Sequence, residues 1–216
     1  TRVRSSAASD VYKRQLIDGG TVVLGGTTNA GTLPTGQLTL RNNATITNSW
    51  PSSGSTQNIA APLLIPTGET ATIRSGRRIW LSGAVTGEGT LNLVHQGTDG
   101  VFQLRGAMNS FAGNLVFTHT GSNPAMNVVF NGASFNGWSA ASVQFPAPLN
   151  LSCTTNSTGN TFGIGQLNGS GTLGGGSAGS PNYTIGGLDT DSTFSGSFAG
   201  NSRITKTGTG VLTLSG

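Results

Sequence analysis

A twelve-residue segment occurs twice in this chain and constrains its fold more than any other feature. Residues 110–121 read SFAGNLVFTHTG and residues 197–208 read SFAGNSRITKTG, so eight of the twelve positions are identical at an offset of 87. A weaker pair, GVFQLRG at 100–106 and GVLTLSG at 210–216, has an offset of 110. Both offsets are near multiples of about 22 residues, a length typical of one coil of a stacked-repeat solenoid.

Short runs in which apolar and polar residues alternate recur along the whole chain and predict β-strands. The predicted strands are 20–24, 37–41, 44–47, 70–74, 78–82, 90–94, 101–105, 114–119, 126–130, 142–145, 149–151, 161–165, 192–196, 203–206 and 211–215. Clusters of Gly, Asn, Pro and Ser between them supply turns, and no stretch has sustained helical periodicity.

A turn–strand unit recurs in TGEGTLNL (86–93), NGSGTLGG (168–175) and TGTGVLTL (207–214). Its L-x-L pattern presents one inward apolar row per strand, and stacked coils would turn such rows into ladders. We therefore predict an all-β fold, a parallel β-helix with coils of about 20–25 residues. A β-sandwich is the alternative, because many short strands also suit that fold.

The first residues of the sequence differ from the rest. Residues 5–15, SSAASDVYKRQ, resemble the translation of a transposase adaptor used to prepare sequencing libraries. We therefore expect 1–15 to be a non-native, disordered segment and 16–216 to be a β-helix fragment, truncated at both ends, of a longer parent chain.

Charge gives no indication of a nucleic-acid partner. The chain has 11 Lys+Arg and 7 Asp+Glu, a net charge of +4, but the first fifteen residues hold four of these basic residues and one acidic residue (Arg2, Arg4, Lys13, Arg14 and Asp10). Only 8% of residues are charged, whereas 35 are glycine. No apolar run approaches the ~20 residues that span a membrane, so we expect no membrane-embedded helix here.

The segment ITKTGTGVLTLSG (204–216) resembles the autotransporter-associated β-strand repeat, whose pattern is approximately K-x-G-x-G-x-L-x-L-x-G. The matching residues are Lys206, Gly208, Gly210, Leu212, Leu214 and Gly216. Residues 93–117 look like a diverged unit of the same repeat. The resemblance implies an exported bacterial protein that carries a signal and lies outside the cell, at the cell surface or at the outer membrane. It implies a β-helical passenger or stalk that acts in display or as an adhesin. It supplies no catalytic residue, because the motif is structural.

Arg74, Arg77, Arg78 and Trp80 form the single basic–aromatic cluster of the sequence. Such a cluster can bind a polysaccharide or a host-surface glycan through charge and ring stacking, and we take Arg77, Arg78 and Trp80 as the candidate glycan site. The alternative is a solvated corner with an inward-facing Trp. Trp50 and Trp138 are further possible sugar platforms.

Other motifs favour structural interpretations. Asp189 and Asp191 could share a Ca²⁺ ion, but two carboxylates are few for that ion and a polar turn is favoured. His95 and His119 are 24 positions apart, so they could stack on neighbouring coils, although zinc needs more ligands.

We interpret Gly169, Gly171 and Gly174, and also Gly175, Ser177 and Gly179, as turn residues, because no helix follows to complete a dinucleotide site or a nucleophile elbow. We interpret Cys153 as a small buried side chain that packs in the core.

These observations predict a non-enzymatic scaffold without metal or cofactor. The alternatives are an extracellular glycan-binding module and a β-helical polysaccharide lyase or hydrolase. The enzyme alternative would need clustered carboxylates, and the acidic residues of this chain are few and widely spaced.

Overall fold

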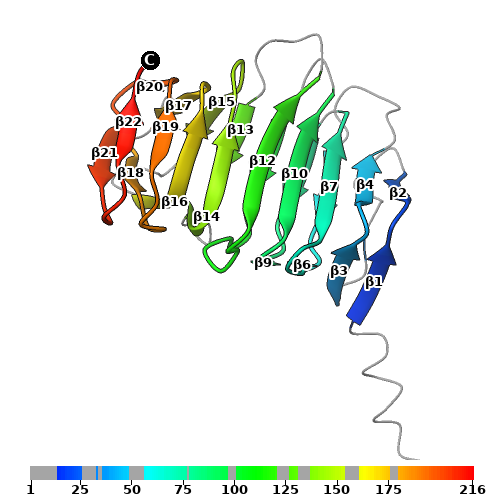
Figure 1. Cartoon of the computed structure of the whole chain (residues 1–216). Helices are drawn as coiled ribbons and strands as arrows, with labels where there is room; N and C mark the ends of the chain where they lie inside the picture. The colour runs from blue at the N-terminus through cyan, green and yellow to red at the C-terminus, as the bar shows by residue number, and fades with distance from the viewer. Residues whose placement is uncertain are drawn as a thin grey trace, which may run out of the picture.

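The computed structural model describes residues 14–25, 33, 36–48, 56–76, 78–96, 101–120, 127–130, 137–153, 161–175 and 180–216. All regular secondary structure in these residues is β-strand, and every pair of neighbouring strands is parallel. Strands of successive coils lie side by side along one axis, from the first strands to the last, and together they form long sheets (Figure 1). The predicted parallel β-helix is therefore confirmed, and the β-sandwich is excluded.

Each coil visits three faces in turn, which we name A, B and C. Face A begins with β1 (Arg14–Asp18), β3 (Gln37–Arg41), β6 (Leu63–Ile65) and β9 (Val85–Gly87). Face B contains β2 (Thr21–Leu24), β4 (Ala44–Asn48), β7 (Thr70–Ser75), β10 (Thr90–His95) and β12 (Asn114–His119). Face C contains β5 (Thr56–Ile59), β8 (Arg78–Leu81), β11 (Val101–Leu104), β13 (Asn127–Phe130), β15 (Asn150–Cys153), β17 (Thr172–Gly175) and β20 (Ser197–Ala199).

Faces A and B merge in the C-terminal coils through two long strands, β14 (Gly137–Phe145) and β16 (Thr161–Gly169). The first half of β16 pairs with β18 (Asn182–Ile185), which pairs with β21 (Arg203–Lys206). The end of β16 pairs with β19 (Ser192–Phe194), which pairs with β22 (Leu212–Leu214). In chain order, β18 and β21 therefore continue face A, and β19 and β22 continue face B.

Inward-facing side chains form ladders along the coil axis, as the L-x-L pattern predicts. On face B, Ile46, Ile73, Leu93 and Phe117 are paired in register on successive strands, and all four are fully buried. Phe117 also contacts Trp138 and Phe145 edge to face, with ring centroids 5.6 and 5.2 Å apart. Burial of each large apolar side chain contributes roughly 1.5–3 kcal/mol, so these ladders are a main source of stability.

The repeated turn–strand unit marks a corner between faces and is not tied to one face. In the first copy, Gly87 ends face A and Thr90 begins face B; in the third, the corner at 207–211 joins β21 to β22 in the same way. In the second copy, however, Gly169 ends face B and Thr172 begins face C. The unit therefore specifies a bend followed by an apolar strand, wherever that bend falls.

The duplicated twelve-residue segment is likewise out of phase with the coils. Its first copy places Phe111 beside Gly87 of face A and then forms β12 on face B. Its second copy forms β20 on face C and then β21 on face A. Coil length also varies, from 20 positions between paired Thr70 and Thr90 to 28 between Asn114 and Ser142.

Each predicted strand corresponds to a strand of the structure, but seven observed strands were not predicted. These are β1, β5, β6, β9, β17, β18 and β20. β1 begins at Arg14, two residues before the predicted boundary at residue 16, and pairs with β3 from Arg14 onward. The rest of the adaptor-like segment, residues 1–13, lies outside the described residues.

We predict that Gly106→Ala destabilises the fold by about 3 kcal/mol, the upper end of the usual range for overpacking, since a β-carbon there overpacks a corner. That carbon would lie 2.0 Å from the Gly83 carbonyl oxygen of the preceding coil. Gly68→Ala is the matched control: Gly68 also lies in a corner, at φ +78°, but no atom lies within 4 Å of the added carbon. It should cost about 1 kcal/mol for its left-handed backbone alone. Equal costs in denaturant unfolding would contradict this account of the corners.

Candidate functional site

The predicted basic–aromatic cluster is divided by the corner between faces B and C. Arg78 and Trp80 both face outward on β8, Arg78 exposed and Trp80 half-buried. Arg74 is exposed on the outer side of β7, which belongs to face B. Arg77 lies outside the described residues. The structure therefore brings Arg78 and Trp80 together on one strand and places Arg74 on a different face.

The Trp80 ring faces outward but is covered by a residue that the sequence did not indicate. The Arg105 guanidinium carbon lies 3.6 Å from the centroid of the Trp80 ring. Arg105 also donates two hydrogen bonds to Gln103 Oε1, at 3.0 and 2.7 Å, and Gln103 is paired with Trp80 on face C. A sugar that stacked on this side of the ring would have to displace Arg105. The sequence could have indicated Arg105 only if the register between neighbouring coils were known, and that register is known only once the fold is known.

The other tryptophan with a described position is not available as a sugar platform. Trp138 is buried in the core and its Nε1 donates to Met108 Sδ at 3.3 Å. The interpretation of Trp138 as a possible platform is therefore wrong, because its strand turns that side chain inward. Trp50 lies outside the described residues.

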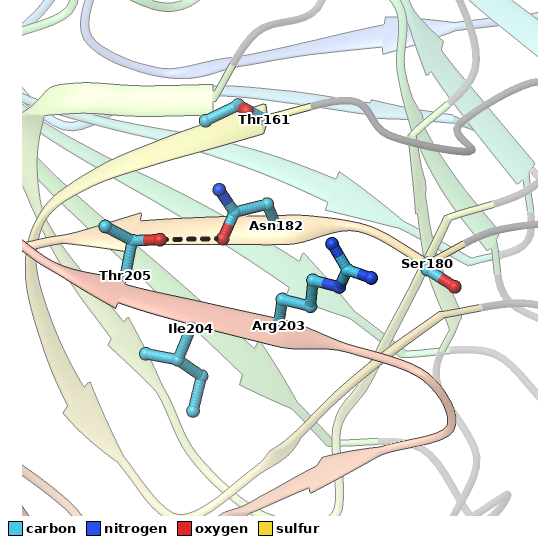
Figure 2. Close-up of a pocket in the computed structure, with 6 residues that line it drawn as sticks. All are labelled: Thr161, Ser180, Asn182, Arg203, Ile204 and Thr205. Atoms are coloured by element: carbon cyan, nitrogen blue, oxygen red, sulfur yellow. Dashed lines mark hydrogen bonds between the residues drawn. The ribbon is translucent and has the colours of Figure 1, made fainter.

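A polar groove of about 550 Å³ lies on the outside of the last coils, lined by β16, β18 and β21 (Figure 2). Thr161, Asn182 and Arg203 line it in register, one from each coil. Ser180, Ile204 and Thr205 complete the described lining, and Thr205 Oγ1 donates to Asn182 Oδ1 at 3.0 Å. The groove offers a guanidinium, an amide and hydroxyls, which can hydrogen-bond a saccharide or an anion. Sequence reasoning missed it because its lining comes from three separate coils.

His95 and His119 stack on neighbouring coils, as their spacing predicted. Their residues are paired in register, their rings are nearly parallel with centroids 5.4 Å apart, and the two Nδ1 atoms are 3.3 Å apart. His95 is buried and also meets Phe102 edge to face. Within the described parts of the chain, no group of three or more His, Cys, Asp and Glu side chains could hold a metal ion.

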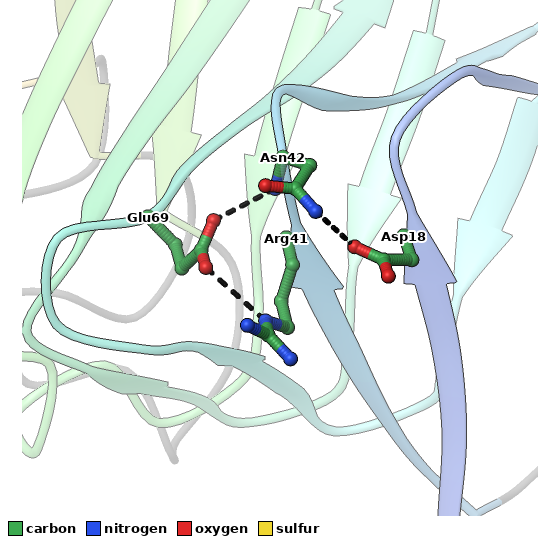
Figure 3. Close-up of polar contacts among 4 residues, drawn as sticks. All are labelled: Asp18, Arg41, Asn42 and Glu69. Carbon is green, nitrogen blue, oxygen red and sulfur yellow. Dashed lines mark hydrogen bonds and ion pairs between the residues drawn. The ribbon is translucent and has the colours of Figure 1, made fainter.

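Carboxylates gather on the corner between faces A and B, where each accepts a hydrogen bond from an adjacent coil. Asp18 accepts from Asn42 Nδ2, while Glu69 accepts from the Asn42 backbone N–H at 2.7 Å and from Arg41 Nε at 3.1 Å (Figure 3). Glu88 accepts from Thr67 Oγ1 at 2.8 Å. These contacts satisfy polar groups at a bend, where strand pairing is interrupted.

The Asp189–Asp191 pair belongs to the same corner and forms a two-point link to the next coil. Asp189 Oδ1 accepts from the Thr209 backbone N–H at 2.8 Å, and Asp191 Oδ1 accepts from the Val211 N–H at 2.8 Å. The favoured polar-turn interpretation agrees with these contacts. Asp189 has φ 58°, a left-handed conformation that Asp tolerates better than most residues.

The residues of the family-like motif lie at this last corner, on the strand that follows it and just beyond that strand. Lys206 Nζ donates to the carbonyl oxygens of Thr207 and Gly208. Gly208 has φ +68°, and a β-carbon there would lie 2.1 Å from the Gly186 carbonyl oxygen. Gly210 and Gly216 similarly lie against the backbone of the preceding coil. Leu212 and Leu214 pair with Ser192 and Phe194 of β19.

The first glycine-rich enzyme-like motif does not form the structure it would need, and most of the second motif lies outside the described residues. Gly169 ends β16, Gly171 lies in the corner and Gly174 lies on β17, so the described chain continues from strand to strand where a dinucleotide site requires a helix. Gly175 ends β17, while Ser177 and Gly179 lie outside the described residues. Cys153 ends β15.

Comparison with protein-family models, curated proteins and solved structures finds no match to this chain. Among the residues that the structure describes, no helix has the length and apolar character needed to cross a membrane.

The corner carboxylates make a specific pH prediction through Glu69. Its pKa is lowered from the ordinary value of 4.5, first by the hydrogen bond from the Asn42 backbone and then by Arg41. A carboxyl group with a lowered folded-state pKa stabilises the fold above its unfolded-state pKa, and this contribution is lost as pH falls through the folded-state value. The wild-type melting temperature should therefore exceed that of Glu69→Gln at neutral pH, and the difference should narrow once pH falls below about 4.5.

Thermal unfolding followed by circular dichroism, at neutral pH and at about pH 3, measures this difference. Arg41→Gln is the matched variant, because it removes the second cause of the shift and leaves the Asn42 hydrogen bond in place. A constant difference between wild type and Glu69→Gln at all pH values would contradict the assignment.

Proposed function

We propose that this chain is a non-catalytic scaffold segment of an exported or surface-located bacterial protein, used for display or adhesion. The observation that carries the proposal is the use of the carboxylates. All five acidic side chains in the described residues, Asp18, Glu69, Glu88, Asp189 and Asp191, accept hydrogen bonds from an adjacent coil. In a β-helical lyase or hydrolase, carboxylates would converge on substrate or metal, whereas these hold consecutive coils together.

The resemblance of residues 204–216 to the autotransporter-associated repeat supports the surface location. Its motif residues bend the backbone and anchor one coil on the previous one, and neither task involves a substrate. A solenoid built this way suits a rod-like spacer, because stability comes from contacts between neighbours and extends with coil number.

Asp191→Ala tests the scaffold role against the enzyme alternative. The substitution removes the acceptor for the Val211 N–H, so we expect a loss of about 1 kcal/mol in unfolding free energy. We also expect no release of reducing or unsaturated sugar ends from a panel of plant and bacterial polysaccharides, with or without Ca²⁺, by either protein. Polysaccharide cleavage by the wild type that disappears in Asp191→Ala, or stabilisation by Ca²⁺ that disappears in it, would favour the enzyme.

A second candidate function, glycan binding on face C, is supported by the outward position of Trp80 beside Arg78. Under this proposal, Arg105 covers the ring in the free protein and gives way to a sugar ring. Trp80→Ala should then abolish binding on a polysaccharide array, whereas Arg105→Ala should preserve or strengthen it by uncovering the ring. Unchanged binding in Trp80→Ala would remove this candidate. Binding lost equally in both variants would point to the arginine charge instead of ring stacking.

A further inference from the structure

A cluster of polar side chains surrounds Trp80 on the outer side of face C. Asn58 and Gln103 are paired with Trp80 from the preceding and the following coil, so the three side chains form one outward row. Ser82 and Arg105 lie just beyond the ends of β8 and β11, and both are half-buried. We call these five residues the face C cluster. Because β8 and β11 each pair with a strand on both sides, the cluster lies inside the stack of coils and not at either end.

The amide oxygens of the face C cluster are occupied within the cluster itself. Ser82 Oγ donates to Asn58 Oδ1 at 2.7 Å. Gln103 Oε1 accepts two hydrogen bonds from Arg105, one from Nε at 3.0 Å and one from Nη2 at 2.7 Å. The amide nitrogens of Asn58 and Gln103 take no part in these bonds, and an amide nitrogen can only donate. The cluster therefore offers a ligand mainly hydrogen-bond donors.

The Arg105 guanidinium is held in place by two contacts before any ligand arrives. Its central carbon lies 3.6 Å from the centroid of the Trp80 ring, and one of its edges is bound to Gln103. A guanidinium carries five N–H donors. Gln103 uses one on Nε and one on Nη2, so both donors of Nη1 and one of Nη2 remain. These remaining donors form the edge that binds a carboxylate through two parallel hydrogen bonds, and holding that edge in advance lowers the entropy cost of binding.

No carboxylate among the described residues neutralises Arg105. The five described carboxylates all lie at the corner between faces A and B, where each is bound to an adjacent coil. Within this same part of the chain, the ion pair that forms joins Arg41 to Glu69. Arg105 therefore adds a positive charge to a cluster of donors, and an anion satisfies both properties better than a neutral sugar does.

We propose that the face C cluster binds the carboxylate of an acidic polysaccharide built of uronic acids. Arg105 contacts both carboxylate oxygens, and the amide nitrogens of Asn58 and Gln103 donate to ring and hydroxyl oxygens of the same sugar. Uronic acids suit this cluster because they carry such oxygens beside the carboxylate. The inference rests on the glycan-binding candidate for its location, but it gives Arg105 the opposite role, since Arg105 here contacts the ligand and does not give way to it.

Calorimetric titration of the full 216-residue chain with polygalacturonate, at low and at physiological ionic strength, tests the proposal. We expect binding that is lost when the polymer is fully methyl-esterified, because esterification removes the charge and keeps the sugar backbone. Arg105→Gln should lower the affinity at least about tenfold. Arg105→Lys should also weaken binding, because an ammonium group keeps the charge but lacks the planar pair of donors.

Arg74→Gln is the matched control, because it removes an exposed arginine from face B and leaves the face C cluster intact. It should bind polygalacturonate like the wild type, and circular dichroism establishes that all variants retain their strands. No binding by the wild type overturns the proposal, as do equal losses in Arg105→Gln and Arg74→Gln. Equal affinity for poly-glutamate also overturns it, since that result would show attraction to any polyanion.

The esterified polymer separates this inference from the other proposals for the chain. Equal binding of the esterified and the charged polymer overturns the inference, and its loss in Trp80→Ala would then support ring stacking on a neutral sugar. The scaffold function is judged by a different readout, because cleavage of either polymer in the same samples would count against a non-catalytic role whether or not Arg105 is needed for binding.

Discussion

Hydrogen bonding between the backbones of consecutive coils is the constraint on which the rest of this structure depends. Parallel strands must lie about 4.8 Å apart to pair, and the chain must bend at each corner without breaking that spacing. A corner therefore has little room for a side chain on the side that faces the preceding coil. This explains why glycine lies there, directly against the carbonyl groups of that coil. The N–H groups of Asn42, Thr209 and Val211 lie at such corners, and each donates to a carboxylate from the adjacent coil.

The same spacing arranges unrelated side chains into rows. Ile46, Ile73, Leu93 and Phe117 lie in one row although 20 to 27 positions separate neighbours, and His95 is brought against His119 in the same way. Trp80 and Gln103 lie in another row on the outside of face C. Chemistry on this scaffold thus arises from residues about one coil apart, and a site such as the groove at Thr161, Asn182 and Arg203 draws one residue from each of three coils.

Much of the fold could be predicted from sequence. The remaining parts could not be predicted, for physical reasons. The L-x-L strands of faces B and C alternate over enough residues to be recognised, and the offset between His95 and His119 predicted their stacking. Leu63–Ile65 is apolar at all three positions and Val85–Gly87 has a single large apolar residue, so neither strand shows an alternation that could be recognised. The inward position of Trp138 and the Arg105 cover on Trp80 depend on exact register, which varies because coils differ in length. The repeat predicted coils correctly, but its copies do not mark equivalent faces.

That mismatch between repeat and face has a consequence for how a gene of this kind changes. Unequal crossing-over between the two SFAGN segments would join a chain leaving face C to one that was about to enter face B. Because each of these segments encodes only a bend and an apolar strand, the recombinant chain can still continue the β-helix. Every residue beyond the junction would then be carried to a neighbouring face. Recombination would therefore turn a different set of outer side chains toward a given partner. The interior ladders would still fit one another, so the outer surface would change while the β-helix is kept.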